Sequence, residues 1–379
     1  MAVYGRGLSH YDIFNAIKDM ERRGLKVIHF EVGDPYLPIN KRIIDVLYRK
    51  TLDGYIHYGS PYGLYEFRRE ILNYLWRKLG IEKGIDEILV TPGSKSGLKM
   101  FIELNRREIS NAILIDPSWS AYRGILNMYN IKIETIGTRF EDGWIPHDSL
   151  NKLEELDFHL LILNNPVNPT GAIYPKNILD TIMDIVAEKD AYIISDEVYF
   201  ETILDRGNRH SSILGYEYEK AVVLFSLSKS HGLTGFRLGW VVAKDEIINR
   251  LARIAQYSYT NIPEFIQYAG IEALNDDGYV ERVRRIYGKR VNILSKGLRR
   301  LGFKFVEPKA TFYIFAKPPL EKDKINEFIY RLVYEKYVGV APGSSFGGYN
   351  DFIRFSAGIY EEDIYEGLER IEDLLNSLD

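Results

Sequence analysis

Residues 159–198 read HLLILNNPVNPTGAIYPKNILDTIMDIVAEKDAYIISDEV. The runs at the two ends, HLLILNNP and AYIISDEV, are rich in Leu and Ile, as buried β-strands are. Between them, KNILDTIMDIVAEKD at 176–190 repeats apolar residues at helical spacing. A strand, a helix and a second strand in this order predict a βαβ unit, from which parallel sheets are built.

Further strand-like runs lie on both sides of this unit. They are DEILVTPG at 86–93, NAILIDPS at 111–118 and AVVLFSLS at 221–228. Together the runs predict an α/β fold with a mostly parallel sheet that is buried on both faces. Each run ends in a polar or turn-forming cluster, and ligands of open α/β sheets bind beyond the carboxyl ends of the strands. We therefore expect the functional site at that edge of the sheet.

The pattern changes after about residue 275. A long helical stretch at 276–302 is followed by the strand-like runs FKFVEP, TFYIFAK and FIRFSAG, which predict a second, α+β domain. The first forty residues contain one strand-like run, VIHFEVG, too little to fold alone. We therefore predict a large domain at 40–278 and a small domain formed by 1–39 and 279–379.

Composition excludes several classes of function. The chain has 379 residues, suggesting about two domains, and its net charge of -4 provides no overall basic field for nucleic acid or an anionic membrane. It has no cysteine, which excludes disulfides, thiolate nucleophiles and cysteine-ligated metals. No two of its seven histidines are three to five residues apart, so no metal site is expected. Without an apolar signal core or membrane-spanning run, we expect a cytoplasmic protein.

The densest group of reactive side chains is SLSKSHGLTGFRLGW at 226–240. Lys229 can act as a Schiff-base nucleophile, whereas the hydroxyls of Ser226 and Ser228 and the guanidinium of Arg237 suit a phosphate. A phosphorylated aldehyde would use all of these groups. The alternative is a surface Lys and Arg in an ordinary loop.

Three more clusters follow predicted strands. NNPVNPTG at 164–171 contains Asn168, which can donate to a ring oxygen, although these residues also favour a plain turn. SDEVYF contains Asp196, which can hold a protonated ring nitrogen or cap a helix. The amides of 93–95 can face an anion at a helix N-terminus, a signal no stronger than a lone glycine-rich loop.

The order and spacing of these clusters resemble the fold-type-I, pyridoxal-phosphate-dependent aminotransferases of class I/II, which include aspartate and aromatic amino-acid aminotransferases. The most specific matches are NPxNPTG, SDEVY and S-x-S-K followed by TGxRxG, with supporting matches in VGDPYLP, YGSPYGLYEFRREI, DPSWSAY, APGSSFG and IRFSAG. The resemblance covers nearly the whole chain. It implies a three-layer α/β/α large domain with a mixed, mostly parallel sheet, and a smaller α+β domain.

The resemblance also implies a role for each matching residue. Lys229 would form the Schiff base with pyridoxal phosphate and move the substrate proton, and Asp196 would keep the pyridine nitrogen protonated. Tyr199 and Asn168 would bind the phenolic oxygen. Trp119 would stack on the ring, with a core tryptophan as the alternative.

The remaining implied contacts concern the phosphate and the substrate. The backbone amides of Ser94 and Lys95, with Ser226 and Arg237, would bind the phosphate. Tyr58 would reach the phosphate of a neighbouring subunit, which implies a homodimer.

Arg354 would bind the substrate α-carboxylate with a bidentate fork, near Gly33 and Asn168. Two departures from the family pattern stand out. Ala310 replaces a usual glycine, and no second arginine can be assigned to a substrate side-chain carboxylate. Arg6, Lys18 and Lys99 are candidate cations for that role.

The implied activity is ping-pong transfer of the amino group of an L-amino acid, aspartate or aromatic, to a 2-oxo acid such as 2-oxoglutarate. Two alternatives stay open. A carbon–sulfur β-lyase that uses the same cofactor would share nearly all of these residues. A non-catalytic ligand-sensing module would require a DNA-binding segment, and only about thirty residues precede VGDPYLP.

Overall fold

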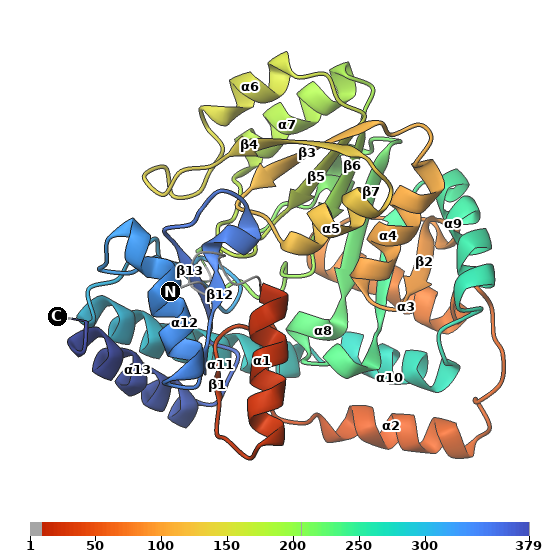
Figure 1. The fold of residues 1–379 in the computed structure, drawn as a ribbon. Helices are drawn as coiled ribbons and strands as arrows, with labels where there is room; N and C mark the ends of the chain where they lie inside the picture. Colours follow the sequence, from red (N-terminus) through yellow and green to blue (C-terminus); the bar gives the residue numbers. More distant parts are fainter. Residues whose placement is uncertain (1–9, 206, 379) are drawn as a thin grey trace.

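The computed structural model describes residues 10–205 and 207–378. Its centre is a seven-stranded sheet (Figure 1). In spatial order the strands are β2 (Ile88–Thr91), β8 (Gly239–Ala243), β7 (Ala221–Ser226), β6 (Tyr192–Asp196), β5 (Leu160–Asn164), β3 (Asn111–Asp116) and β4 (Lys132–Gly137). Strand β8 is antiparallel to both neighbours and all other pairs are parallel. The prediction of a mixed, mostly parallel sheet is confirmed.

The predicted βαβ unit is β5, α7 (Lys176–Glu188) and β6. Strands β5 and β6 pair in parallel from Leu160↔Tyr192 to Asn164↔Asp196, and every residue of β5 is buried. Alternate side chains of β5 enter different cores, because successive residues of a strand point to opposite faces. A strand covered on both faces must be apolar throughout, which explains the uninterrupted run LLIL.

Helices cover both faces of the sheet (Figure 1). One core contains side chains of α4 (Ser94–Asn105), α5 (Ser120–Met128) and α9 (Asp245–Ser258). The opposite core contains side chains of α2 (Lys41–Leu52), α3 (Tyr65–Leu79), α6 (Ser149–Glu155), α7 and α10 (Glu264–Leu274). The three-layer arrangement is confirmed.

A third core joins the two ends of the chain, because it includes side chains from 13–30 and from 279–374. Its helices are α1 (His10–Arg22), α11 (Asp277–Arg300), α12 (Ile325–Tyr334) and α13 (Glu361–Asn376). Its strands are the parallel pair β1 (Ile28–His29) and β11 (Val338–Gly339), and the antiparallel set β12 (Ala341–Pro342), β13 (Ile353–Ser356), β10 (Tyr313–Lys317) and β9 (Lys304–Phe305). The shared core supports a small domain built from both ends, whereas the boundaries at 39/40 and 278/279 stay a prediction.

The short helices complete the fold. They are α8 (Leu227–Ser230) and the 3₁₀ segments η1 (Ile85–Glu87), η2 (Ile213–Tyr216), η3 (Thr234–Phe236), η4 (Lys322–Lys324) and η5 (Gly343–Phe346). Within 10–205 and 207–378, no helix is both long and apolar enough to cross a membrane.

Candidate active site

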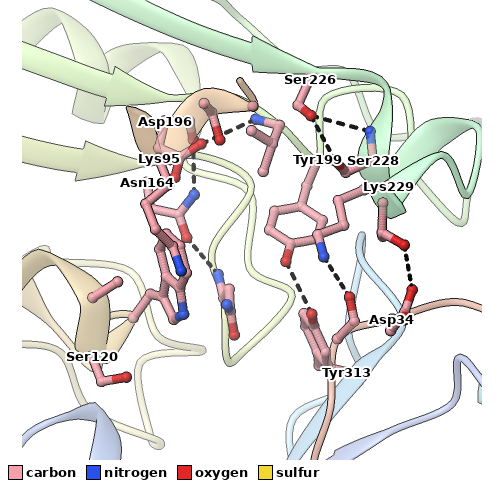
Figure 2. A pocket seen from close by; sticks show the side chains of 18 of the residues that line it. Asp34, Lys95, Ser120, Asn164, Asp196, Tyr199, Ser226, Ser228, Lys229 and Tyr313 are labelled. Atoms are coloured by element: carbon pink, nitrogen blue, oxygen red, sulfur yellow. Dashed lines mark hydrogen bonds between the residues drawn. The ribbon is translucent and has the colours of Figure 1, made fainter. Parts of the chain in front are cut away.

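A cavity of about 460 Å³ lies beyond the carboxyl ends of β5, β6 and β7. All the residues to which the family resemblance assigns a cofactor or substrate contact, except Tyr58, line it: Gly33, Ser94, Lys95, Trp119, Asn168, Asp196, Tyr199, Ser226, Lys229, Arg237 and Arg354. These residues come from segments up to 321 positions apart, from 33 to 354. Figure 2 shows the side chains of several of them converging on one space.

Lys229 is on α8, the short helix that directly follows β7. The hydroxyl of Ser226 accepts a hydrogen bond from the backbone N–H of Ser228 at 3.1 Å and so caps this helix. The Lys229 ammonium donates to the carbonyl oxygen of Gly33. A side chain at Gly33 would collide with the hydroxyl of Tyr313, so glycine lets this backbone approach the lysine.

Asp196 is the last residue of β6, and its residue surface is 3% exposed. Its carboxylate accepts hydrogen bonds from the Tyr122 hydroxyl at 2.8 Å and the Val198 amide at 3.4 Å. Burial raises the pKa of Asp196 to about 6, although these bonds and the Lys229 charge act in the opposite direction. A positively charged N–H donor in the cavity would therefore stabilise the ionised carboxylate of Asp196.

The hydroxyls of Tyr199 and Tyr313 share a hydrogen bond of 3.0 Å. Tyr199 follows β6, and Tyr313 begins β10 in the core that joins the chain ends. Burial raises the pKa of Tyr199 well above its usual value, so the hydroxyl stays protonated at neutral pH. It can donate to an oxygen in the cavity.

Arg354 is a buried cation on β13, only 4% exposed. Its guanidinium donates to the side-chain oxygen of Asn168 at 3.0 Å and to the carbonyl oxygen of Glu31. Its Nε has no partner, and no carboxylate of the described chain forms an ion pair with it. A buried charge without a counter-ion is costly, and an entering carboxylate would reduce that cost.

Positive groups also collect around the N-terminus of α4. Gly93 precedes the helix with φ of 76°, and no side chain caps the first amides. The Arg237 guanidinium lies against Gly93 and donates to the carbonyl oxygen of Pro92 at 3.1 Å. Partial burial and the charges of Arg237 and Lys229 lower the pKa of Lys95, whose ammonium lies 4.8 Å from the Trp119 ring centroid. These features suit an anion.

Other polar residues line the cavity without a role predicted from the sequence, among them Tyr122, Asn164 and Tyr313. Tyr122 and Tyr313 are inside the motifs DPSWSAY and TFYIFAK, but a sequence motif does not show where a side chain points. Asn164 accepts from the Asn168 amide at 2.7 Å, which fixes the turn after β5.

The predicted distal cations do not reach the cavity. Lys18 pairs with Glu21 at 2.7 Å, Lys99 pairs with Glu103 at 2.7 Å, and Arg6 lies outside the described residues. Neither lysine lines the cavity. Tyr58 is 89% exposed in the segment between α2 and α3, also outside it.

The sequence profile of a family described as "Aminotransferase class I and II" matches residues 26–371. The chain belongs to this aminotransferase family.

Relatives within the family have several named substrates. An aspartate aminotransferase from Thermococcus kodakarensis is 32% identical over 349 residues, which cover 91% of this chain and 87% of that protein. An LL-diaminopimelate aminotransferase from Halothermothrix orenii is also 32% identical, with 96% and 94% covered. The solved structure of an aromatic aminotransferase from Pyrococcus horikoshii matches with a TM-score of 0.87 at 31% identity, covering 96% of this chain and 99% of that one.

Aminotransferases of this family use pyridoxal phosphate, and this protein is a pyridoxal-phosphate-dependent aminotransferase. Two observations test whether the cavity fits the cofactor. Asp196 is a buried carboxylate whose ionisation needs a cationic partner, which a protonated pyridine nitrogen provides. The uncapped helix start and the Arg237 guanidinium provide donors for a phosphate. The residues fit the group.

Proposed function

We propose that this aminotransferase transfers the amino group of L-aspartate or an aromatic L-amino acid to a 2-oxo acid such as 2-oxoglutarate, in two ping-pong half-reactions. The observation that supports this proposal most strongly concerns one stretch of backbone. The carbonyls of Glu31 and Gly33 accept hydrogen bonds from Arg354 and Lys229, respectively. A carboxylate-binding cation and a primary amine are thereby held on the same wall of one cavity, as an α-amino acid substrate requires.

The proposed cofactor contacts follow from the same geometry. The amides of Ser94 and Lys95 would bind the phosphate together with Ser226, Ser228 and Arg237. Asp196 would hold the pyridine nitrogen, and Tyr199 with Asn168 would donate to the phenolic oxygen. Trp119 would cover one face of the ring.

Pyridoxal phosphate, when bound, supplies an aldehyde that bonds to an amine and a ring that accepts the electron pair left on the substrate Cα. The chain's residues do the rest. Arg354 binds and orients the α-carboxylate through its fork. Lys229 would take the proton from the substrate Cα and deliver it to the carbon that the cofactor's aldehyde contributes, because its amine lies on the same wall of the cavity as Arg354. Asp196 holds the positive charge of the ring nitrogen.

We propose that Lys95 selects acidic substrates. Four side-chain cations line the cavity, and three have other proposed roles in Lys229, Arg237 and Arg354. The Lys95 ammonium, beside the Trp119 ring, remains for a second substrate carboxylate. The same indole would contact an aromatic substrate, so one site can accept both classes that the relatives' names suggest.

Lys95→Met should lower kcat/KM for aspartate about tenfold while changing kcat/KM for phenylalanine by less than about twofold. The backbone amide stays in place, so the phosphate contact should persist. Lys99→Met on the same helix is the matched control, because Lys99 pairs with Glu103 outside the cavity. Equal losses for the two substrates would contradict the assignment of Lys95.

The proposed reaction can be tested with single L-amino acids added to the holoenzyme. The visible spectrum should convert to that of the aminated cofactor with aspartate, glutamate or phenylalanine, and one equivalent of 2-oxo acid should be released. Multiple turnovers should require 2-oxoglutarate. Sustained release of pyruvate from a β-thio-substituted amino acid without any oxo acid would instead establish the β-lyase reaction.

We further propose a homodimer in which Tyr58 completes the neighbouring site. Large apolar side chains are exposed along 48–76: Tyr48 (63%), Leu52 (70%), Ile56 (61%), Tyr58 (89%), Tyr65 (58%) and Trp76 (56%). Such a concentration of exposed apolar groups is typical of a surface that binds another protein.

Tyr58→Phe should leave a dimer in sedimentation equilibrium but weaken cofactor retention about tenfold, because a hydroxyl bond to a charged phosphate is lost. Tyr257→Phe is the control, since Tyr257 is also exposed, at 88%, but belongs to α9. A monomeric wild-type chain, or unchanged cofactor affinity in Tyr58→Phe, would overturn the proposal.

A further inference from the structure

A second cavity, of about 770 Å³, shares no lining residue with the candidate active site. Three segments form it: the end of α3 at 78–79, residues from 200–210 after β6, and the 281–289 part of α11. It therefore lies where the segment that carries Tyr199 meets the helix that leads into the C-terminal part of the chain.

The lining of this cavity carries an excess of positive charge. Its cations are Lys78, Arg209, Arg284, Arg285 and Lys289. Its carboxylates are Glu201, Asp205 and Glu281. Two more carboxylates, Asp277 and Glu361, lie outside the lining but pair with Lys78 and Lys289. The positive charge left for a small anion therefore belongs to guanidinium groups of the lining.

Two of the guanidinium groups have no carboxylate partner within the described chain. Arg285 donates only to the carbonyl oxygen of Glu281 in its own helix, at 3.4 Å. Arg209 forms no hydrogen bond or ion pair with the described residues. By contrast, Lys78 pairs with Glu201 at 3.0 Å and Lys289 pairs with Glu361 at 2.5 Å. Arg209 and Arg285 are thus the groups available to a ligand.

His210 supplies an independent feature. Its side chain is 3% exposed and lines the cavity, and its Nδ1 has no partner among the described residues. Its Nε2 lies 2.8 Å from a carboxylate oxygen of Glu197, which has no proton to donate when ionised, so Nε2 is the donor. Nδ1 is then a buried polar atom that needs a ligand.

We propose that this cavity binds a small anion with at least two negative charges, of the phosphate or polycarboxylate class, through Arg209, Arg285 and Nδ1 of His210. The planar fork of arginine matches the oxygens of such anions. Because Nε2 already donates to Glu197, hydrogen bonding of the anion to Nδ1 requires the doubly protonated imidazolium.

The site also connects to the candidate active site. Glu197 directly follows Asp196 and accepts hydrogen bonds from the hydroxyl of Ser195 at 3.0 Å and the amide of Ile213 at 3.1 Å. The same Glu197 carboxylate contacts Nε2 of His210 and is one of the charges that raise the pKa of Asp196. Glu197 therefore links the second cavity to the carboxylate proposed to hold the cofactor ring.

Calorimetric titration of the cofactor-saturated holoenzyme with inorganic pyrophosphate tests the site, since saturation keeps the phosphate subsite of the active site occupied. We expect one site per chain, with affinity reduced about tenfold or more by Arg285→Ala or Arg209→Ala. Lys296→Ala is the control, because Lys296 is an exposed cation of α11 that does not line the cavity. Absence of saturable binding, or an equal loss of affinity in the control, would overturn the proposal.

His210→Gln tests the imidazole itself. Glutamine can still donate to Glu197 through its amide but has no equivalent of Nδ1. Titration with sulfate, a dianion throughout the neutral range, compares the affinities of the two proteins. We expect His210→Gln to bind sulfate about tenfold more weakly than the wild type, with near-ultraviolet circular dichroism verifying the fold. Equal affinity in the two proteins would eliminate His210 from the site.

Discussion

Lys229→Ala is expected to lower kcat with aspartate or phenylalanine by about 10⁴-fold or more, the largest effect of any single substitution in this chain. The variant lacks both the amine proposed to bond to the cofactor's aldehyde and the base proposed to move the Cα proton. The surrounding structure should persist, because the cap between Ser226 and the amide of Ser228 does not involve the lysine side chain.

The loss should concern chemistry rather than cofactor affinity. The proposed phosphate contacts at α4 and Arg237 are untouched, so the purified variant should still retain pyridoxal phosphate after dialysis. Rapid mixing with one amino acid measures the first half-reaction directly. Lys99→Ala is the matched control, as this lysine pairs with Glu103 outside the cavity. A Lys229→Ala variant with more than about a tenth of wild-type activity would contradict the mechanism.

The parallel strands could be predicted from the sequence because each is covered on both faces and must be apolar throughout. The run LLIL of β5 meets that requirement. The polar clusters that end the strands mark the edge of the sheet where the site lies. The runs VIHFEVG and FKFVEP predict strands where β1 and β9 lie, but these strands are only two residues long and depend on partners at 338–339 and 316–317. No local pattern specifies the pairing of Ile28 with Val338, 310 positions away.

The candidate site, too, could be predicted only in part from the sequence. Lys229, Asp196 and Asn168 follow strands whose ends must meet, so their convergence could be inferred from topology. The hydroxyl of Tyr122 points to Asp196 and that of Tyr313 to Tyr199 because of helix and strand orientation, which motifs do not express. Lys18 and Lys99, two of the candidate cations for a second carboxylate, do not line the cavity, and each pairs instead with a nearby glutamate.

Asp196→Asn is expected to lower kcat/KM about 10³-fold and, at the same time, to stabilise the cofactor-free protein above neutral pH. Catalysis falls because a neutral amide cannot hold the positive charge of the ring nitrogen in a buried site. Stability rises because the same burial that makes the carboxylate useful penalises its charge when no cofactor is present. The two effects share one cause and should appear together.

The direction of the pH dependence follows from the raised pKa of Asp196, about 6 in the folded protein against an ordinary value of 3.8. The folded chain holds this proton more tightly than the unfolded chain does. Its contribution to stability is therefore fully present below pH 3.8 and is lost as the pH rises through 6. This gap corresponds to about 3 kcal/mol at most, since each tenfold change in proton affinity is about 1.4 kcal/mol.

Urea unfolding of the cofactor-free proteins measures the effect as the difference between Asp196→Asn and wild type. That difference should be near zero below pH 3.8, where Asp196 is protonated in the folded and the unfolded chain alike, and should grow to about 1–3 kcal/mol in favour of the variant above neutral pH. Asp190→Asn is the control, because the Asp190 side chain is 82% exposed and carries little desolvation cost. Added pyridoxal phosphate should reverse the order at alkaline pH, since only the wild-type carboxylate gains a cationic partner. The interpretation of Asp196 as a buried carboxylate stabilised by a cationic group of the cofactor would be wrong in either of two cases. The variant would be less stable than the wild type without cofactor, or it would be nearly as active as the wild type with cofactor.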